Sequence, residues 1–292
     1  MQTSEANYLA LEQWQDLASK HRTEVRKWTA PYRQRRASHQ PHPVFDFLFT
    51  YYPFSLGKLE QWHPGYGIIL ECPHEAPARF QSKHYQHHDG IVSLNPNSLG
   101  EKEINRLKWI YNLLSLTQKR TPHFACHGLH EWAMVYGAQN IRHRESTPLR
   151  LSQQEVDHVV QSRPITCSHF DAYRFFSTDA LGFNKLKPTL ENREHFEQCG
   201  CLHTNMDLYK WASKCMPWVG SVLLWQCFQL ALKARELDMR ASPYDLSSHG
   251  YEPVKIETTE GRAQYETLQR EISSLAMPLR QQIIDKLARI TS

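Results

Sequence analysis

Residues 219–237 read VGSVLLWQCFQLALKAREL, and this stretch decides the fold class. Its large apolar side chains recur at helical spacing with few charges between them, which predicts a helix that is largely buried. Such a helix needs other helices to cover it. Helical periodicity returns over residues 102–116, 124–136 and 262–290, and after the capping box Ser152-x-x-Glu155. We therefore predict a mainly α protein that forms a single globular helical domain over residues 1–292.

The N-terminal half should add a peripheral helix and a small β element. Residues 7–37, approximately, carry apolar positions in a charged background, which predicts an amphipathic surface helix. Short extended segments are expected at residues 68–70, 78–85, 90–94 and 148–151, so a small sheet should pack on the helical body. In the last helix, Pro278 should produce a kink or a break, because proline removes a helical hydrogen bond.

Composition and missing motifs exclude several classes of function. A net charge of +4 is too small to predict nucleic-acid binding by itself. The chain has no apolar run of membrane-helix length, and residues 1–6 lack signal-peptide features, so we expect a cytoplasmic protein without a membrane partner. Seven scattered cysteines without a Cys-x-x-Cys pair favour reduced thiols. Walker, Rossmann, α/β-hydrolase and zincin motifs are absent from the sequence.

The first segment with candidate chemistry is rich in histidine. His123, His127, His130 and Glu131 are spaced so that one helix would place them on one face. Imidazole and carboxylate groups suit iron, manganese or zinc, so this segment predicts ligands for a divalent transition metal. Gly128 argues against the prediction, because glycine within the segment weakens the helix.

Two further segments resemble each other: residues 168–175, SHFDAYRF, and residues 204–211, TNMDLYKW. In each, a hydroxyl residue precedes an acid by three positions, which predicts a capping box that opens a helix. On that interpretation Asp171 and Asp207 are structural, and each lies within reach of the cation three residues later. The neighbouring His169 and His203 favour a second interpretation, in which the aspartates bind a metal or act as general bases.

Three other places could bind a charged ligand. Two facing helix starts would form an anion-accepting cleft that includes Asn205. Arg240 and Tyr244 follow the buried helix and could clamp an anionic substrate or cofactor, although their segment is also ordinary turn chemistry. The stretch Arg26–Arg36 interleaves cations with aromatic residues, a pattern that holds a phosphate backbone or stacks a base. The interpretation that we favour is a solvated helix end, whose cations complement the helix dipole.

Several separated motifs together resemble a bacterial protein family of about this length. They are FDFLFTYY at 45–52, QWHPG at 61–65, LHEWAMVY at 129–136, HFD at 169–171, HTNMDLYKW at 203–211 and MRASPYD at 239–245. Members of that family are often labelled 3-methyladenine DNA glycosylase, and the resemblance runs through nearly the whole chain from Trp28 onward. The label implies that a base flips into an aromatic pocket, and that a carboxylate, here Asp171 or Asp207, assists its departure. The stacking residues would be Trp132, Tyr173, Tyr209 or Trp211. The Gly-rich hairpin of helix-hairpin-helix glycosylases is not found in this sequence.

Three hypotheses follow. The first is an enzyme with one buried site of histidines and carboxylates. A divalent metal would support hydrolytic or oxidative chemistry there, and the substrate would be a small molecule or a nucleobase. The second is a metal-free DNA-repair glycosylase that holds DNA through Arg26–Arg36. The third is a non-catalytic protein that binds a small anion. The candidate catalytic groups are Glu131, His169, Asp171, His203 and Asp207. The candidate metal ligands are His127, His130, Glu131, His169 and His203.

Overall fold

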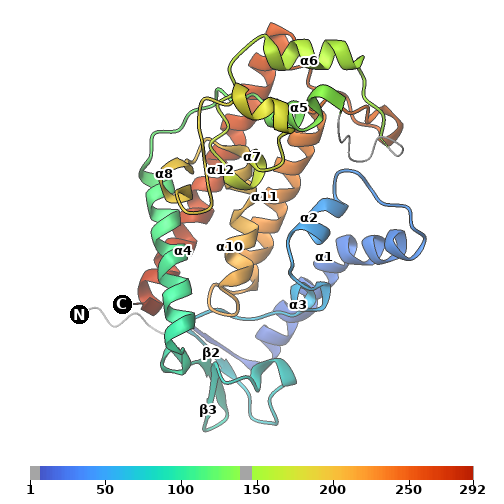
Figure 1. Cartoon of the computed structure of the whole chain (residues 1–292). Helices are drawn as coiled ribbons and strands as arrows, with labels where there is room; N and C mark the ends of the chain where they lie inside the picture. The colour runs from blue at the N-terminus through green and yellow to red at the C-terminus, as the bar shows by residue number, and fades with distance from the viewer. Residues whose placement is uncertain (1–6, 139–146, 292) are drawn as a thin grey trace.

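Three long helices form the body of the protein in the computed structural model, which describes residues 7–138 and 147–291 (Figure 1). Helices α11 (Ser221–Arg240) and α12 (Thr259–Thr291) pack against each other, and α4 (Glu101–Lys119) packs along α12. The mainly α, single-domain fold is thereby confirmed. Residues 1–6, on which the signal-peptide argument was based, lie outside the described part.

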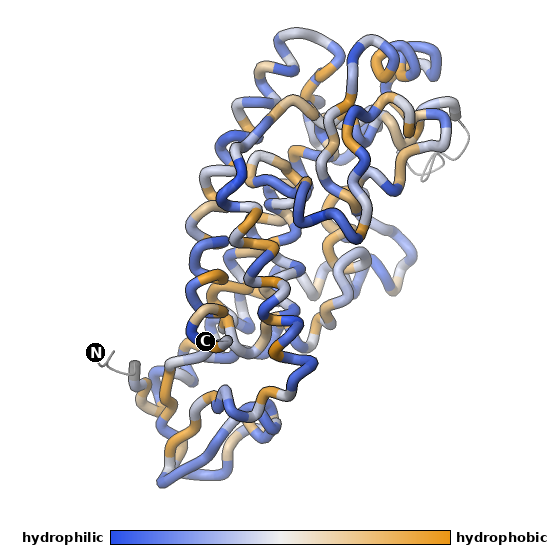
Figure 2. The backbone as a smooth tube through the Cα atoms, turned by 60° about the vertical axis from the view of Figure 1, so that its left-hand side comes forward, coloured by the Kyte–Doolittle hydropathy of each residue, from blue (hydrophilic) through white to orange (hydrophobic). Residues whose placement is uncertain are grey.

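The sequence explains why these helices pack. In α11 the apolar side chains point in most directions, and Leu224, Phe228 and Ala234 are completely buried. In α12 the buried residues recur every three or four positions, which places them on one face of the helix. They include Tyr265, Gln269, Ile272, Ala276, Arg280, Ile283, Leu287 and Ile290. Figure 2 shows the corresponding alternation of hydrophobic and hydrophilic segments along the long helices.

Pro278 does not split the last helix, contrary to the break that we considered. Helix α12 continues through Pro278 to Thr291. Both Pro278 and Ser274, whose carbonyl loses its helical donor, are exposed to solvent. Water can therefore satisfy that carbonyl, and the apolar face on either side of the proline stays packed.

The other helices surround the body. They are α1 (Leu11–Ala37), α2 (Asp46–Tyr51), α3 (Leu56–Glu60), α5 (Leu129–Val135), α6 (Gln153–Gln161), α7 (Phe170–Tyr173), α8 (Arg193–Phe196), α9 (Leu202–Met206) and α10 (Leu208–Lys214). The predicted capping box of α6 is confirmed, since Glu155 N–H donates to Ser152 Oγ over 3.3 Å and Ser152 N–H donates to the Glu155 carboxylate over 2.8 Å. Short 3-10 helices occur at Ala78–Phe80, Pro96–Ser98, Tyr136–Ala138, Thr178–Phe183 and Ser247–His249.

The small sheet lies at one end of the body, in the N-terminal half (Figure 1). Its strands are β1 (Asn7–Leu9), β2 (Ile68–Glu71), β3 (Tyr85–His88) and β4 (Ile91–Leu94), in the order β1-β2-β4-β3. Strand β1 is parallel to β2, and the other pairs are antiparallel. Two expected segments differ: residues 78–85 begin as a 3-10 turn, and residues 148–151 form only a bridge between Leu149 and Tyr244.

A close backbone contact ties the N-terminal part to the start of α11. Tyr66 N–H donates to Trp218 O over 2.8 Å, and Ser221 N–H donates to His63 O over 2.9 Å. Gly220 has a φ of 82°, and a Cβ atom there would lie 2.8 Å from the carbonyl oxygen of Pro64. Only glycine fits this position without strain. In the described residues, no helix has both the length and the apolar character needed to cross a membrane.

Candidate metal centre

Four buried or nearly buried side chains from three helices converge beside α11. They are His130 and Glu131 of α5, His203 of α9 and Asp238 of α11. One donor atom from each lies within 4.8 Å of the others, so this group could hold a metal ion. His130 Nε2 lies 2.8 Å from Asp238 Oδ1, and His203 Nε2 lies 3.6 Å from Asp238 Oδ2.

One cation also contacts the carboxylates of this group. Arg235 Nη1 donates to Asp238 Oδ2 over 2.7 Å and to Glu131 Oε1 over 3.2 Å. Arg235 precedes Asp238 by one helical turn on α11, and both side chains are buried. The two oxygens of Asp238 therefore have different partners: Oδ2 accepts from Arg235, and Oδ1 faces His130.

Burial and neighbouring charges separate the protonation behaviour of these groups. Burial, together with the nearby Asp238, raises the pKa of Glu131 to about 7. Burial alone would raise the pKa of Asp238, but the adjacent imidazoles and the Arg235 guanidinium hold it well below its usual value. Burial lowers the pKa of His203 to about 3, so this imidazole is neutral at physiological pH. Burial alone would lower the pKa of His130, but Cys126 and Asp238 raise it well above its usual value, so a metal would have to displace the proton of that imidazole. A neutral imidazole and an ionised carboxylate are the forms that bind metals, and His203 and Asp238 are in these forms.

A second group contains His169, Asp171 and Asp207, whose donor atoms also lie within 4.8 Å of one another. A lysine already bridges its acids, since Lys210 Nζ lies 2.8 Å from Asp171 and 3.0 Å from Asp207. The Tyr52 hydroxyl donates to Asp207 Oδ1 over 2.9 Å. Burial alone would raise the pKa of Asp207, but Lys210 and His169 hold it well below its usual value. In this group the ammonium group of Lys210 contacts both carboxylates that would otherwise be available to a metal ion.

Histidine rings connect the two groups. The ring centroids of His130 and His203 are 4.6 Å apart, and those of His169 and His203 are 5.6 Å apart. His169 Nε2 in turn lies 3.3 Å from Asp207 Oδ2. The three segments that the sequence indicated therefore form one buried polar network.

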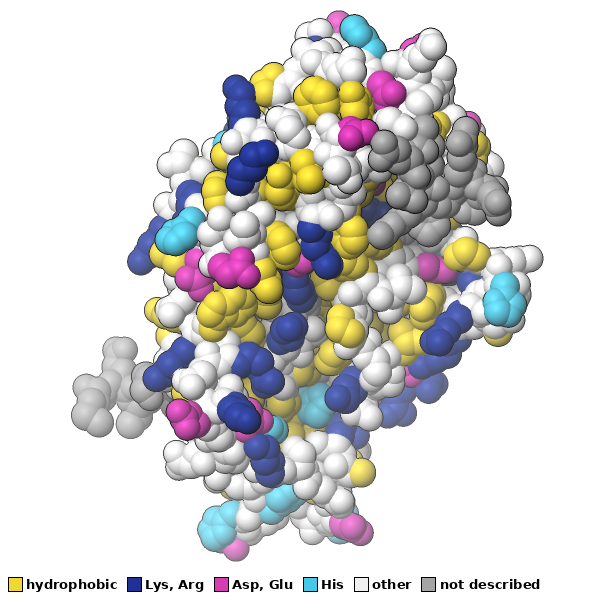
Figure 3. Space-filling view, viewed as in Figure 1, with side chains coloured by type: hydrophobic (Ala, Val, Ile, Leu, Met, Phe, Trp, Pro, Cys, Tyr) yellow, Lys and Arg dark blue, Asp and Glu magenta, His cyan; other side chains and the backbone are white. Residues whose placement is uncertain are grey.

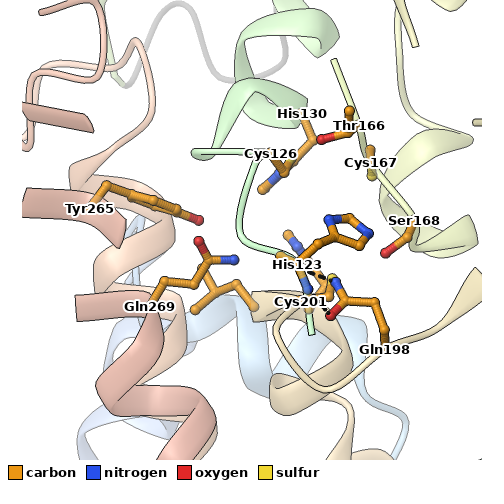
Figure 4. Close-up of a pocket in the computed structure, with 12 residues that line it drawn as sticks. His123, Cys126, His130, Thr166, Cys167, Ser168, Gln198, Cys201, Tyr265 and Gln269 are labelled. Atoms are coloured by element: carbon orange, nitrogen blue, oxygen red, sulfur yellow. Dashed lines mark hydrogen bonds between the residues drawn. The ribbon is translucent and has the colours of Figure 1, made fainter. Parts of the chain in front are cut away.

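A small cavity adjoins this network (Figure 4). Its volume is about 10 Å³, enough for roughly one water molecule. His130, His203 and three cysteines contribute to its walls. Ser168 Oγ and Gln269 Oε1, which also line it, are buried and have no hydrogen-bond partner within the described residues. A bound water would satisfy such groups.

One cysteine of this cavity orients a candidate ligand. Cys126 Sγ lies 3.4 Å from His130 Nδ1, while His130 Nε2 faces Asp238. A contact at Nδ1 fixes the ring and directs Nε2 toward a metal. The same order of thiol, imidazole and carboxylate also activates cysteine nucleophiles. All seven cysteines are free thiols.

His127 lies outside both groups, contrary to its predicted place among the metal ligands. Helix α5 begins only at Leu129, because His127 and Gly128 have left-handed φ values of 46° and 76°. The segment therefore turns before the helix starts, and His127 Nε2 lies 3.7 Å from Glu266 instead. Because of the turn at Gly128, His123, His127, His130 and Glu131 do not share one helical face as expected.

The two predicted capping boxes are wrong. Helix α7 begins at Phe170 without a side-chain cap, and Thr204 lies inside α9. Ser168 Oγ and Thr204 Oγ1 are buried without partners in the described residues. The acids instead bind cations, as the structural interpretation predicted: Asp171 pairs with Arg174 at 3.1 Å, besides the contact between Asp207 and Lys210.

The residues predicted to bind a cofactor occupy two different places. Arg240 and Tyr244 line a separate, larger cavity. Asn205 is completely buried, donates to Cys199 O over 2.9 Å and accepts a hydrogen bond from Arg280. The expected cleft between helix starts therefore does not use Asn205, because α12 supplies the buried arginine that binds it.

The basic stretch on α1 is largely paired with acids. Arg26 and Arg33 contact Glu60 at 3.3 and 2.6 Å, and Arg35 forms an ion pair with Asp46. On the face in Figure 3, lysine and arginine side chains are interspersed with hydrophobic and acidic ones. These pairings reduce the charge that the stretch offers to a phosphate backbone.

Sequence reasoning did not identify Asp238, Arg235, Lys210 or Cys126 as site residues. A signal existed for two of them. Arg235 and Asp238 are charged residues spaced one turn apart on a helix that is otherwise apolar and buried, and buried charges require partners.

Comparisons of this chain with protein-family models, curated proteins and solved structures found no match.

Proposed function

We propose that this protein is a metal-dependent enzyme with His130, His203 and Asp238 as ligands and Glu131 beside them. The observation that carries the proposal is the convergence of four donor atoms within 4.8 Å of one another, from helices distant in sequence. The 2.8 Å between His130 Nε2 and Asp238 Oδ1 matches two ligands that share one ion, because metal–ligand bonds of about 2 Å place adjacent donors about 3 Å apart.

This group is preferred over the one formed by His169, Asp171 and Asp207. In the second group Lys210 contacts both carboxylates, so an ion would have to displace a buried ammonium. In the first group Arg235 also contacts both carboxylates, Asp238 through Oδ2 and Glu131 through Oε1, but it leaves Asp238 Oδ1 facing His130. A metal can therefore bind there while the arginine keeps its partner.

The donor set indicates the chemistry. Two imidazoles and one carboxylate suit iron, manganese or zinc, and leave coordination positions for a reactant. A metal held in this way would act as a Lewis acid in hydrolytic chemistry or bind an oxidant in oxidative chemistry. The cavity beside His203 limits the reactant that reaches this side to about the size of water. Glu131, next to the ligands, would carry a proton during the reaction.

Metal binding tests the proposal directly. Protein produced without a histidine tag would be stripped with a chelator and then titrated with zinc, manganese or iron(II), with elemental analysis of the product. We expect one ion per chain and a rise in melting temperature on loading. His203→Gln should weaken binding at least tenfold, because it removes one ligand. Asp171→Asn is the matched control from the second group and should bind normally.

Two results would count against the proposal. Substoichiometric metal, with melting unchanged by the chelator, would exclude a metal centre. Normal binding by His203→Gln, with loss in Asp171→Asn, would place the ion in the other group. Release of free alkylated base from methylated DNA by the metal-free protein would instead support the glycosylase activity that the family resemblance implies.

A further inference from the structure

A second cavity lies between Arg150 and the loop that follows α11. Its volume is about 180 Å³, and it shares no lining residue with the smaller cavity or with either donor group. By the volume per molecule in liquid water, this space equals about six waters, which is the size of one aromatic ring with a small substituent. Its walls include Arg150, Arg240, Tyr244, Leu246, Tyr251 and Pro253.

The apolar part of the wall fits a flat ring. Tyr244 is only 9% exposed and Leu246 only 4%, so these side chains are held in place by the fold. Tyr251 and Pro253 complete this part of the wall. Aromatic and aliphatic side chains that are fixed before binding favour a planar, apolar ligand body.

The polar part of the wall includes one arginine donor that the described residues do not pair. Arg240 donates from Nε to Glu252 O over 2.9 Å and from Nη1 to Glu236 over 3.4 Å, and its Nη2 makes no hydrogen bond within the described residues. Arg150 is fixed by a bidentate pair with Glu257 and lies 5.2 Å from the ring centroid of Trp132. The lining residues carry two guanidinium groups and one carboxylate, Asp245, and the acids that pair with the guanidiniums, Glu257 and Glu236, do not line the cavity. The Nη2 group of Arg240 is the donor that remains for an acceptor group on the ligand.

We infer that this cavity binds a small aromatic carboxylate, with its ring against Tyr244 and Tyr251 and its carboxylate on Arg240. The site is independent of the metal centre, and metal-free protein should bind the ligand as well as metal-loaded protein. Binding here and metal binding are measured separately, so one can fail without the other.

Benzoate is the probe, titrated calorimetrically into chelator-treated, full-length protein. We expect a dissociation constant of about 1 mM or below, as suits a ligand of this size. Ser247 lines the cavity and is exposed, so Ser247→Trp should fill the mouth and abolish binding without disturbing the core. Ser248→Trp is the matched control, because the neighbouring Ser248 is exposed and does not line the cavity.

A second pair of variants tests the role of the arginine. Arg240→Met should weaken benzoate binding about tenfold or more, because it removes a charge-assisted hydrogen bond. Arg270→Met, at an exposed position on α12, should leave binding unchanged. Equal effects of both substitutions would overturn the assignment of Arg240.

Two analogues separate the parts of the ligand. Benzamide keeps the ring and removes the charge, and acetate keeps the charge and removes the ring. We expect both to bind at least tenfold more weakly than benzoate. The inference is overturned by benzoate binding that survives Ser247→Trp, by acetate or benzamide binding as tightly as benzoate, or by no detectable benzoate binding at about 10 mM.

Discussion

Replacing Asp238 by asparagine should destabilise the protein severely, because Asp238 is the main counter-ion of buried Arg235. The side chain of Asp238 is completely buried and contacts Arg235 at 2.7 Å and His130 at 2.8 Å. Asparagine keeps the shape and removes the charge. Breaking a buried ion pair on one side costs about 3–5 kcal/mol, which is a large part of the roughly 5–15 kcal/mol that stabilises an ordinary domain.

The free energy of unfolding would be measured by urea denaturation of metal-free protein, followed by circular dichroism. Asp171→Asn is the control. Asp171 has a side chain that is 12% exposed, and its partner Lys210 retains Asp207, so the loss should be only about 1–2 kcal/mol. Chelation of metal matters in both cases, because an ion bound to the folded state would add its own stabilisation.

A double variant provides the decisive comparison. Adding Arg235→Met to Asp238→Asn removes the uncompensated cation, and Glu131, whose burial raises its pKa to about 7, can then take up a proton. The double variant should therefore be more stable than the sum of the two single losses predicts. Strict additivity, or a loss below about 1 kcal/mol in Asp238→Asn, would refute the ion-pair account.

Three further predictions concern pH, metal affinity and the backbone. Burial lowers the pKa of His63 from 6.5 to about 4, so the folded protein favours the neutral imidazole and should lose up to about 3 kcal/mol of stability as the pH falls from 6.5 to 4. Urea denaturation at several pH values should show a smaller loss in His63→Gln. Cys126→Ala should weaken zinc binding about tenfold or more, because the His130 ring loses the contact that orients it, whereas Cys227→Ala in α11 should leave zinc binding unchanged. Equal zinc affinities of the two variants in a competitive titration would contradict this role of Cys126. Gly220→Ala should lower the melting temperature in calorimetry, because its Cβ would lie 2.8 Å from a carbonyl oxygen at a φ of 82°, and an unchanged melting temperature would disprove the close contact.

Local features of the structure could be predicted where adjacent residues decide them. The helices at residues 101–119 and 221–240, the strands at 68–71 and 91–94 and the capping box at Ser152 follow from periodicity and from short-range hydrogen bonding. The pairing of Asp207 with Lys210, one turn later, follows from helical spacing in the same way. Where the local signal was ambiguous, prediction failed: Ser168 and Thr204 resemble helix caps, but both are buried in the packed interior.

The sequence by itself determined the mainly helical fold and the three segments that carry the buried histidines and acids, because hydrophobic periodicity and residue type are properties of neighbouring residues. Only the tertiary structure decided which side chains meet. His130 and Asp238 are 108 positions apart in sequence, and their contact depends on how α5 packs on α11. In the same way, the contact between α9 and α12 directs Asn205 to Arg280. Such contacts require the whole core, because the position of each helix is set by apolar surfaces that many distant residues share.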